Sequence, residues 1–313
     1  MGGGFGLADV ENNSPVSERT LFLLGSISKS LTAVAAMELW ERGQLDLDVP
    51  VQKYSHSFPR NPGPSRHVKS WVIREASATT NPTRRMTPKS VTRSTSTIPL
   101  PRALISSGMT LWWHSRAGTS TIPRKATHWL VGCVMQGASG AKYLDFMRQN
   151  IVVPAGMERT QADDRFAIIP CRTRFYRKSD SGIVQNDDFL DSSYKIPGGG
   201  WLSWAEDMAR FEVAILSDKL LKRPTRDLMW TPLKPSDGSK DTYGLGWRVG
   251  NEDGNVTVGH SGGQQGTSTD FLIAPSQRAG VVVLTNMQSL NPNELAVEIL
   301  KILVNGSAKA EKK

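Results

Sequence analysis

The chain has few cysteines and no long apolar run. Only Cys133 and Cys171 are cysteines among its 313 residues, which excludes a disulfide-rich scaffold and a zinc site built on cysteines. No apolar stretch reaches the ~18 residues that a membrane-spanning helix needs, so we expect a soluble protein. The start, Met1 to Phe5, is too short and too apolar for a secretory or transit peptide. The length allows one large domain with a sizeable core.

Acidic residues are nearly missing from one window. The whole chain carries 38 Lys and Arg against 29 Asp and Glu, for a net charge of +9. From Arg66 to Trp129 the only acid is Glu75, and the window lacks Tyr, Phe and Asp while it is rich in Ser and Thr. It shows neither helical nor strand periodicity. Such a stretch is typical of a disordered loop or a nucleic-acid patch. It interrupts a well-patterned chain, and a structureless loop of this length is uncommon inside a domain. Binding of nucleic acid through this window is the least favoured interpretation, and we expect no nucleic-acid partner.

Outside this window the apolar residues follow regular periods. A helical period followed late in the chain by short alternating segments predicts an α+β architecture. The period predicts helices over Ser28 to Gly43, Leu130 to Val153, Ser203 to Leu216 and Asn293 to Val304, and strands over Val256 to Val258, Thr269 to Ala274 and Gly280 to Thr285. The remaining residues, 305–313, are predicted to form a tail.

The chemistry begins where the first predicted helix begins. Ser26 and Lys29 have the spacing Ser-x-x-Lys, which puts both side chains on one helix face, one turn apart. A serine at a helix start lies beside backbone N–H groups that can stabilise an oxyanion. A lysine in a poorly solvated pocket can lose its proton near neutral pH and accept the proton of the serine. Taken alone, the spacing also fits a serine N-cap next to a solvated lysine.

Further motifs decide between these two interpretations. They are Phe22-x-x-Gly25-Ser-Ile-Ser-Lys-Ser-Leu-Thr-Ala33, Leu39-Trp-Glu-Arg-Gly-Gln-Leu-Asp-Leu-Asp-Val-Pro-Val-Gln-Lys-Tyr54, Pro154-Ala-Gly-Met157-Glu-Arg-Thr160, Gly198-Gly-Gly-Trp-Leu-Ser203 before Asp207-Met-Ala-Arg-Phe211, Tyr243-Gly-Leu-Gly-Trp247 and Gly259-His-Ser-Gly-Gly263. In this order they resemble the serine β-lactamase-like family of the class C β-lactamase and penicillin-binding-protein type. The resemblance is strongest to the animal mitochondrial members.

The resemblance implies a β-lactamase/transpeptidase-like fold. This fold consists of an antiparallel sheet flanked by helices, plus a helical subdomain. We expect residues 1–304 to form a single domain of this kind. In the family a helix and two strands precede the segment with which this chain starts. We therefore expect that part to be truncated here, together with any targeting peptide. By resemblance the protein is expected in the mitochondrion.

The resemblance also assigns the site. It makes Ser26 the nucleophile and Lys29 the general base, with no metal or cofactor. His260, Ser261 and Gly262 match the family's Lys/His-Thr/Ser-Gly triplet on an edge strand, and the N–H groups of Gly263 and Ser26 would form the oxyanion hole. A substrate that pairs along such an edge needs small residues for close approach, which glycines provide.

One family motif is missing. A tyrosine motif stands between the serine helix and the Pro-Leu-Gly-Met turn in the family, yet no tyrosine occurs between Tyr54 and Tyr143. If the coding sequence slipped by one base near Pro64 and was restored near Leu130, the offset codons are compatible with an acidic peptide that contains Tyr-Ser-Thr. This hypothesis makes residues 64–129 a frame-shifted segment that we expect to be poorly ordered. The underlying nucleotide sequence tests it.

The sequence thus predicts a serine hydrolase that acts by acyl transfer on a peptide or amide substrate. We expect its activity to be impaired, because the missing tyrosine is one member of a unit that acts together, and such a loss commonly costs several orders of magnitude in rate. Two alternatives stay open. One is an esterase or D-amino-acid peptidase of the same fold. The other is a catalytically weak scaffold that self-assembles into a homo-oligomer or filament.

Overall fold

The computed structural model describes residues 2–56, 68, 127–188, 191–232 and 242–310. Its largest sheet has four antiparallel strands in the order β11-β10-β9-β8. These are β8 (Arg248–Glu252), β9 (Asn255–Gln264), β10 (Thr267–Ala274) and β11 (Ala279–Thr285). The prediction of a late antiparallel sheet is confirmed. The strand predicted to end at Val258 continues to Gln264, and β8 was not predicted.

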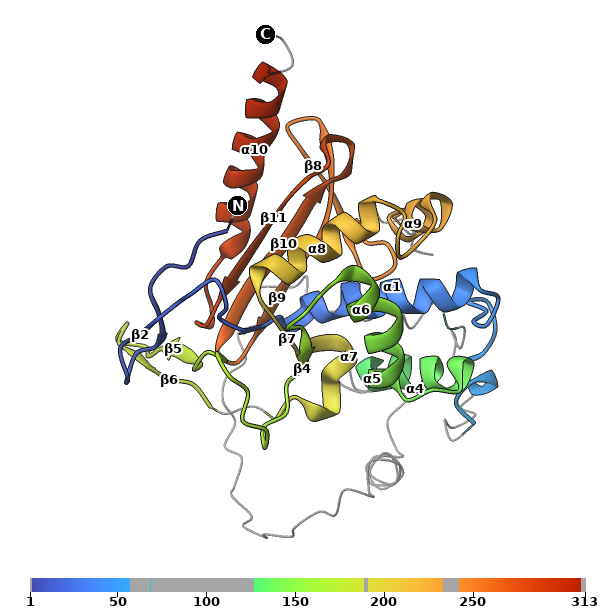
Figure 1. The fold of residues 1–313 in the computed structure, drawn as a ribbon, viewed down its shortest axis with the longest axis horizontal. Coiled ribbons are helices and arrows are strands. Elements are labelled where there is room, and N and C mark those ends of the chain that lie inside the picture. The colour runs from blue at the N-terminus through green and yellow to red at the C-terminus, as the bar shows by residue number, and fades with distance from the viewer. Residues whose placement is uncertain (1, 57–67, 69–126, 189–190, 233–241, 311–313) are drawn as a thin grey trace.

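Helices cover both faces of this sheet (Figure 1). The side chains of β10 alternate: Leu272 packs with Leu300 of α10 (Pro292–Ala310) on one face. On the other face the ring of Phe271 lies 6.3 Å from that of Phe211 of α8 (Ala205–Leu216) and 6.0 Å from that of Trp247. With both faces covered, β10 is apolar without alternation over its second half, Phe271 to Ala274. The core therefore lies on both sides of β10.

Helix α1 (Ser28–Glu41) runs through the middle of the molecule, after the 3-10 turn η1 (Gly25–Ile27) (Figure 1). Its residues from Ser28 to Leu39 are all buried. Gly43 follows with a left-handed φ of 71°, as expected of a glycine that ends a helix. The predicted helix over Ser28 to Gly43 is thus confirmed to within two residues at its end.

The single helix predicted over Leu130 to Val153 is wrong. Instead α4 (Thr127–Ser139) ends before Gly140, whose φ is 70°. The chain resumes as α5 (Tyr143–Met147), the π turn η5 (Arg148–Val152) and α6 (Val153–Ala155). A left-handed glycine breaks the helical path, whereas apolar spacing alone does not register a break. Pro154 lies in the first turn of α6, where a proline is tolerated because its missing N–H has no helical partner.

Shorter elements complete the fold. A three-stranded sheet has the order β3-β7-β4, and two hairpins are formed by β1 with β2 and by β5 with β6. The bounds are β1 (Leu7–Asp9), β2 (Ser14–Pro15), β3 (Phe22–Leu23), η2 (Val51–Lys53), β4 (Gln161–Ala162), β5 (Tyr176–Lys178), β6 (Val184–Asn186), η6 (Ser193–Lys195), α7 (Ile196–Gly199), β7 (Trp201–Ser203), α9 (Arg223–Met229) and η7 (Pro275–Gln277).

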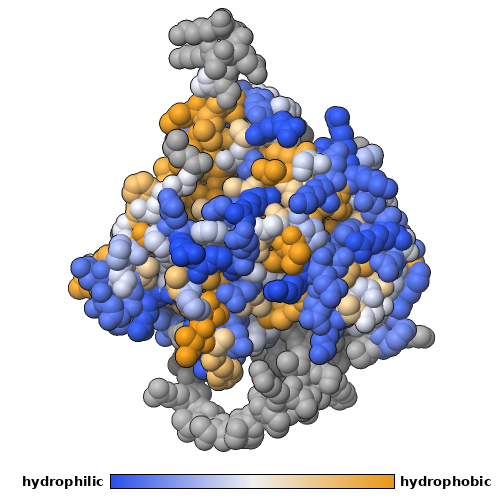
Figure 2. All heavy atoms as spheres, in the orientation of Figure 1, coloured by the Kyte–Doolittle hydropathy of each residue, from blue (hydrophilic) through white to orange (hydrophobic). Residues whose placement is uncertain are grey.

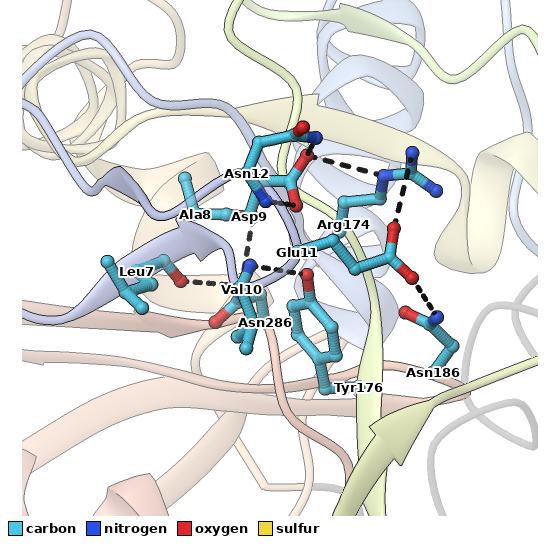
Figure 3. Close-up of polar contacts among 10 residues, drawn as sticks. All are labelled: Leu7, Ala8, Asp9, Val10, Glu11, Asn12, Arg174, Tyr176, Asn186 and Asn286. Atoms are coloured by element: carbon cyan, nitrogen blue, oxygen red, sulfur yellow. Dashed lines mark hydrogen bonds and ion pairs between the residues drawn. The ribbon is translucent and has the colours of Figure 1, made fainter.

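The N-terminal segment is fastened to the body by polar contacts (Figure 3). The hydroxyl of Tyr176 accepts a hydrogen bond of 2.8 Å from the backbone N–H of Val10. The side chain of Asn286, beyond β11, donates to the carbonyl of Leu7 at 3.1 Å. Arg174 forms ion pairs with Asp9 at 3.5 Å and with Glu11. These contacts bind residues 7–11 to β5, to the residues just before it and to the segment that follows β11.

The window from residue 64 to 129 lies almost entirely outside the described residues. Within it, Val68 is buried and its N–H donates to the carbonyl of Val49 at 3.0 Å, and residues 127–129 begin α4. At the other end, α10 continues to Ala310. The last helix, predicted to end at Val304, is therefore longer than predicted, because its helical hydrogen bonding runs on to Ala310.

On the face that Figure 2 shows, polar side chains are interspersed with apolar patches, one of which lies over α10. Leu295 and Ile302 are exposed there. None of the helices in the described ranges combines the length and the apolar character needed to cross a lipid bilayer.

Candidate active site

Ser26 and Lys29 meet at the start of α1. Ser26 lies in η1 and Lys29 in the first turn of α1, and the Nζ of Lys29 lies 2.7 Å from the Oγ of Ser26. The serine is half-buried, and the lysine is only 6% exposed. The predicted pair is therefore in direct contact, and Lys29 is not the solvated side chain of the alternative interpretation.

Burial changes the acidity of the lysine. Desolvation, and next the positive charge of Arg248, lower the pKa of Lys29 from 10.5 to about 8. Both causes disfavour the ammonium form, because a charge is costly in a poorly solvated site and like charges repel. A substantial fraction of Lys29 is then a neutral amine near physiological pH, the form that accepts a proton from a serine.

Glycines bring the serine turn against the end of β9. Gly25 has a left-handed φ of 55°, and a Cβ added to it would lie 3.0 Å from the nitrogen of Gly263. A Cβ on Gly262 would lie 2.2 Å from both the carbonyl oxygen of Leu24 and the Oγ1 of Thr269. Real Cβ atoms do not approach as closely as 2.2 Å, so position 262 requires glycine. At position 25 the left-handed φ favours glycine, and the 3.0 Å contact is already tight. The structure thus brings together two predicted parts of the site, Ser26 and the Gly262–Gly263 edge.

The edge of β9 next to the serine is open in the described structure. Strand β8 pairs with β9 from Glu252↔Asn255 to Arg248↔Gly259. From His260 to Gln264 the described residues supply a strand partner only on the other side, from β10. An extended peptide can add to such an edge by main-chain hydrogen bonds.

His260 is the first residue of this open edge, and it is buried. Its ring is 2% exposed and stands edge-to-face to Tyr243 at 5.7 Å. Its Nδ1 lies 2.6 Å from the carbonyl oxygen of Ser261, and a carbonyl can only accept, so Nδ1 carries a proton. On the other face of the strand, Ser261 is paired with Asp270 of β10, a carboxyl group whose pKa is raised by burial.

The remaining sequence motifs hold α1 in place. In the Tyr243–Trp247 motif the carbonyl of Gly246 accepts a hydrogen bond of 2.8 Å from the Oγ of Ser30. Gly246 has a φ of 75°, and a Cβ there would lie 2.4 Å from the Cβ of Ala33. This close approach packs the loop against the helix directly behind Lys29.

Asp207 connects two further motifs. Its carboxylate accepts hydrogen bonds from the backbone N–H groups of Glu158 and Arg159, at 3.0 and 2.8 Å, and from the Oγ1 of Thr160 at 2.8 Å. Thr160 also contacts the Oγ of Ser203 at 2.7 Å. The Pro154–Thr160 turn is thereby fixed to the start of α8, and a structural role explains why these residue types occur together.

Sequence reasoning did not single out Arg248, Lys195 or Gln264. Arg248 is charged and lies at the start of β8, but no periodic pattern marked that strand. Lys195 and Gln264 are far apart in sequence, yet the Nζ of Lys195 lies 2.5 Å from the Oε1 of Gln264. Only the fold places these three residues around the open edge.

The fold is that of the β-lactamases and transpeptidases. An octameric penicillin-binding protein homologue from Pyrococcus abyssi has a TM-score of 0.69 and 22% identity over 96% of this chain and 70% of its own. The D-amino acid amidase from Ochrobactrum anthropi SV3 has a TM-score of 0.70 and 19% identity over 99% of this chain and 89% of its own. The fold class predicted from sequence is confirmed.

The β-lactamase family model matches residues 2–305, and the chain belongs to the β-lactamase family. The mitochondrial serine β-lactamase-like protein LACTB from Mus musculus is 27% identical over 95% of this chain and 73% of its own length. The predicted resemblance to this family, and to its mitochondrial members in animals, is confirmed.

Proposed function

We propose that this protein is a serine hydrolase that acts by acyl transfer on a peptide or amide, with Ser26 as nucleophile and Lys29 as general base. The observation that carries the proposal is the 2.7 Å contact between the Oγ of Ser26 and the Nζ of a buried Lys29. The open edge of β9 favours an extended peptide or amide over a compact ester. The D-amino acid amidase of similar fold supports an amide substrate.

The chemistry follows from the two side chains. Neutral Lys29 takes the proton of Ser26 while the Oγ attacks the substrate carbonyl, and the N–H groups of Ser26 and Gly263 stabilise the oxyanion. The ammonium of Lys29 returns its proton to the leaving amine as the C–N bond breaks. Water then attacks the acyl-enzyme, Lys29 accepts its proton, and the released serine recovers it. No step needs a metal or a cofactor.

The activity toward unactivated amides is proposed to be weak. In the part of the chain that the structure describes, no tyrosine hydroxyl bonds Ser26 or Lys29, and Tyr143 is instead bound to the Oγ1 of Thr32 at 2.8 Å. Lys29 alone must then move both protons. We further propose that residues 64–129 derive from a shifted reading frame. Nucleotide sequence across this region that cannot encode the acidic, tyrosine-containing peptide would overturn that proposal.

A fluorophosphonate probe tests the nucleophile. This probe phosphorylates an activated serine and needs no protonation of an amine leaving group, so we expect a covalent adduct on Ser26 by intact-protein mass spectrometry and peptide mapping. Ser26→Ala should abolish the adduct, whereas Ser14→Ala, an exposed serine in β2, should keep it. Absence of labelling together with self-assembly in solution would favour the scaffold alternative. The esterase alternative is distinguished by comparing peptide anilides with aryl esters of the same acyl group.

We propose a mitochondrial location on the resemblance to LACTB, which is named as a mitochondrial protein. Fractionation of cells that express the natural transcript, followed by immunodetection in purified mitochondria, tests this. Detection only in other fractions would contradict it.

A further inference from the structure

Asp270 is a buried carboxyl group beside the open edge of β9. Its residue is 1% exposed. In the ladder between β9 and β10 it stands directly opposite Ser261, so the two side chains share one face of the sheet. That face is the one that α10 covers, because Leu272, two residues further along β10, packs against Leu300. The acyl-transfer steps described above make no use of this carboxyl group.

Three groups from three elements act on Asp270. The hydroxyl of Ser261 in β9 forms a hydrogen bond with its carboxyl group. The Nδ2 of Asn293, in the first turn of α10, donates to its Oδ2 at 3.2 Å. The positive charge of Arg248 in β8 attracts it as well. Burial raises the pKa of Asp270, and these three groups, each of which favours the anion, oppose the rise.

The carboxylate of Asp270 decides which way the hydroxyl of Ser261 points. A carboxylate can only accept hydrogen bonds, whereas a serine hydroxyl has one proton and two lone pairs. The proton of Ser261 is therefore directed at Asp270, and the lone pairs remain for a ligand. Ser261 is half-buried and lies in the segment of β9 where β8 no longer pairs with it. A substrate on this edge then meets a hydrogen-bond acceptor at Ser261.

The leaving group is the part of a substrate that lies beside Ser261. The N–H of Gly263 is proposed to bind the oxyanion, and Ser261 lies two residues nearer to Gly259, where the pairing with β8 stops. Arg248, the partner of Gly259, is close enough to Lys29 to lower its pKa, after the larger effect of desolvation. Since Lys29 delivers its proton to the leaving group, the leaving group extends toward this end of the edge.

We propose that Asp270 is a positioning residue that keeps Ser261 an acceptor, so that the site selects a leaving group carrying an N–H over one carrying a carboxylate. A carboxylate would face the lone pairs of Ser261 with no proton between them, whereas an amide N–H donates to them. The proposal rests on the proposed function, because it needs a leaving group expelled from an acyl group on Ser26. It narrows the reaction to internal peptide bonds and amides, and disfavours release of a single C-terminal amino acid.

Two thioesters with the same acyl group test this selection. They are hippuryl thioglycolic acid and hippuryl thioglycolamide, whose leaving thiols differ only in a carboxylate against a carboxamide. A chromogenic disulfide follows thiol release, and intact-protein mass spectrometry shows the hippuryl group on Ser26. Rates are corrected with Ser26→Ala and divided by the rates of hydrolysis by hydroxide, so that the reactivity of the two thioesters cancels. We expect the amide to acylate the full chain about tenfold faster than the acid.

An isosteric variant reverses the hydroxyl. Asp270→Asn can still accept from Asn293, but its amide donates to Ser261 and frees the hydroxyl proton for the substrate. It should raise the rate with the acid about tenfold and remove the preference. Asp180→Asn changes an exposed aspartate in the turn after β5 and should leave the ratio of the two rates as it is in wild type.

Ser261→Ala separates the hydroxyl from the charge of Asp270. It deletes the acceptor and should by itself abolish the preference for the amide, a result that decides the matter even if Asp270→Asn fails to fold. Adding Asp270→Asn to Ser261→Ala should change the ratio little, because no hydroxyl is left to turn.

Four results would overturn the role of Asp270. They are a wild-type chain without preference for the amide, a preference that persists in Ser261→Ala, an Asp270→Asn variant that alters both rates equally, and an Asp270→Asn effect of the same size with and without Ser261. Failure of both thioesters to acylate Ser26 instead overturns the proposed function.

Discussion

Gly25 and Gly263 lie back to back, and a side chain on Gly25 would stand 3.0 Å from the nitrogen of Gly263. This contact joins the turn that carries Ser26 to the strand proposed to hold the substrate. Neither segment has a side chain at the junction, so the distance between nucleophile and sheet is set by backbone contact. A single added methyl group should therefore disturb the site at Gly262, which faces the serine turn. At Gly263, whose added methyl group would point to the opposite face of β9, there is room for it.

Gly262→Ala and Gly263→Ala should separate these two sides. The added methyl group at Gly262 meets the carbonyl of Leu24 and the Oγ1 of Thr269 at 2.2 Å, whereas at Gly263 it meets nothing within 4 Å. We expect Gly262→Ala to lose about 2–3 kcal/mol of unfolding free energy, and Gly263→Ala to keep the wild-type Tm. Chemical denaturation and thermal melts measure both. Equal stability of the two variants would show that the junction can relax.

The rate of fluorophosphonate labelling should rise with pH, with a midpoint at about pH 8, and level off above it. The reason is that deprotonation of Lys29, whose pKa is lowered to about 8, produces the base. Lys29→Met should label at least about 10²-fold more slowly at pH 8. In Arg248→Met the repelling cation is gone, so the pKa of Lys29 rises and the midpoint moves to higher pH. A midpoint unchanged by Arg248→Met would show that desolvation alone sets this pKa.

Glu212→Gln should stabilise the protein at alkaline pH. Burial raises the pKa of Glu212 from 4.5 to about 7, and its carboxylate lies over Gly280. Because the folded state binds this proton more tightly than the unfolded state, stability falls as pH rises from about 4.5 to 7. We expect Glu212→Gln to be more stable than wild type by about 2–3 kcal/mol at pH 8, with a smaller difference at pH 5.

Denaturation at both pH values measures this effect. Glu18→Gln changes an exposed glutamate and serves as the matched control, which should leave the pH dependence as it is in wild type. A Glu212→Gln variant that is less stable than wild type at pH 8 would contradict the assigned burial of the charge.

Tyr176→Phe should loosen the N-terminal segment. The change removes the acceptor for the N–H of Val10, a hydrogen bond of 2.8 Å between segments far apart in sequence (Figure 3). We expect a loss of about 1 kcal/mol and faster hydrogen exchange over residues 7–12. Tyr194→Phe also deletes a tyrosine hydroxyl, one without a hydrogen bond in the described structure, and should leave this exchange unchanged. Equal exchange in both variants would mean that the contacts of Arg174 and Asn286 are enough to hold the N-terminal segment in place.

Local periodicity predicted the structure correctly where that structure depends only on residues within one segment. The spacing of Ser26 and Lys29 predicted a contact one helical turn apart, and Gly43 predicted the end of α1. The same reasoning failed at Gly140, because apolar spacing continues across a glycine whether or not its φ is positive. It also stopped β9 at Val258, since small and polar residues over His260–Gly263 carry no strand signal of their own.

The family resemblance supplied the pairing of Ser26 with the Gly262–Gly263 strand, which spacing could not give. No sequence signal pointed to Lys195 with Gln264, or to Arg248 beside Lys29. These contacts join segments whose relative positions depend on helix packing against a sheet, and helix or strand periods describe only the residues within one element.

The amino-acid sequence by itself determined which groups are available: a serine and a lysine one helical turn apart, glycines at the points of close approach, and alternating apolar residues for a sheet. Only the tertiary structure decided how reactive and how selective these groups are. Burial and the positive charge of Arg248 lower the pKa of Lys29. The pairing of β8 with β9 stops at Gly259, and in the described structure this leaves an edge of β9 open between Arg248 and Lys195. Both effects depend on solvent exclusion and on charges brought together from distant parts of the chain, and these quantities exist only once the chain has folded.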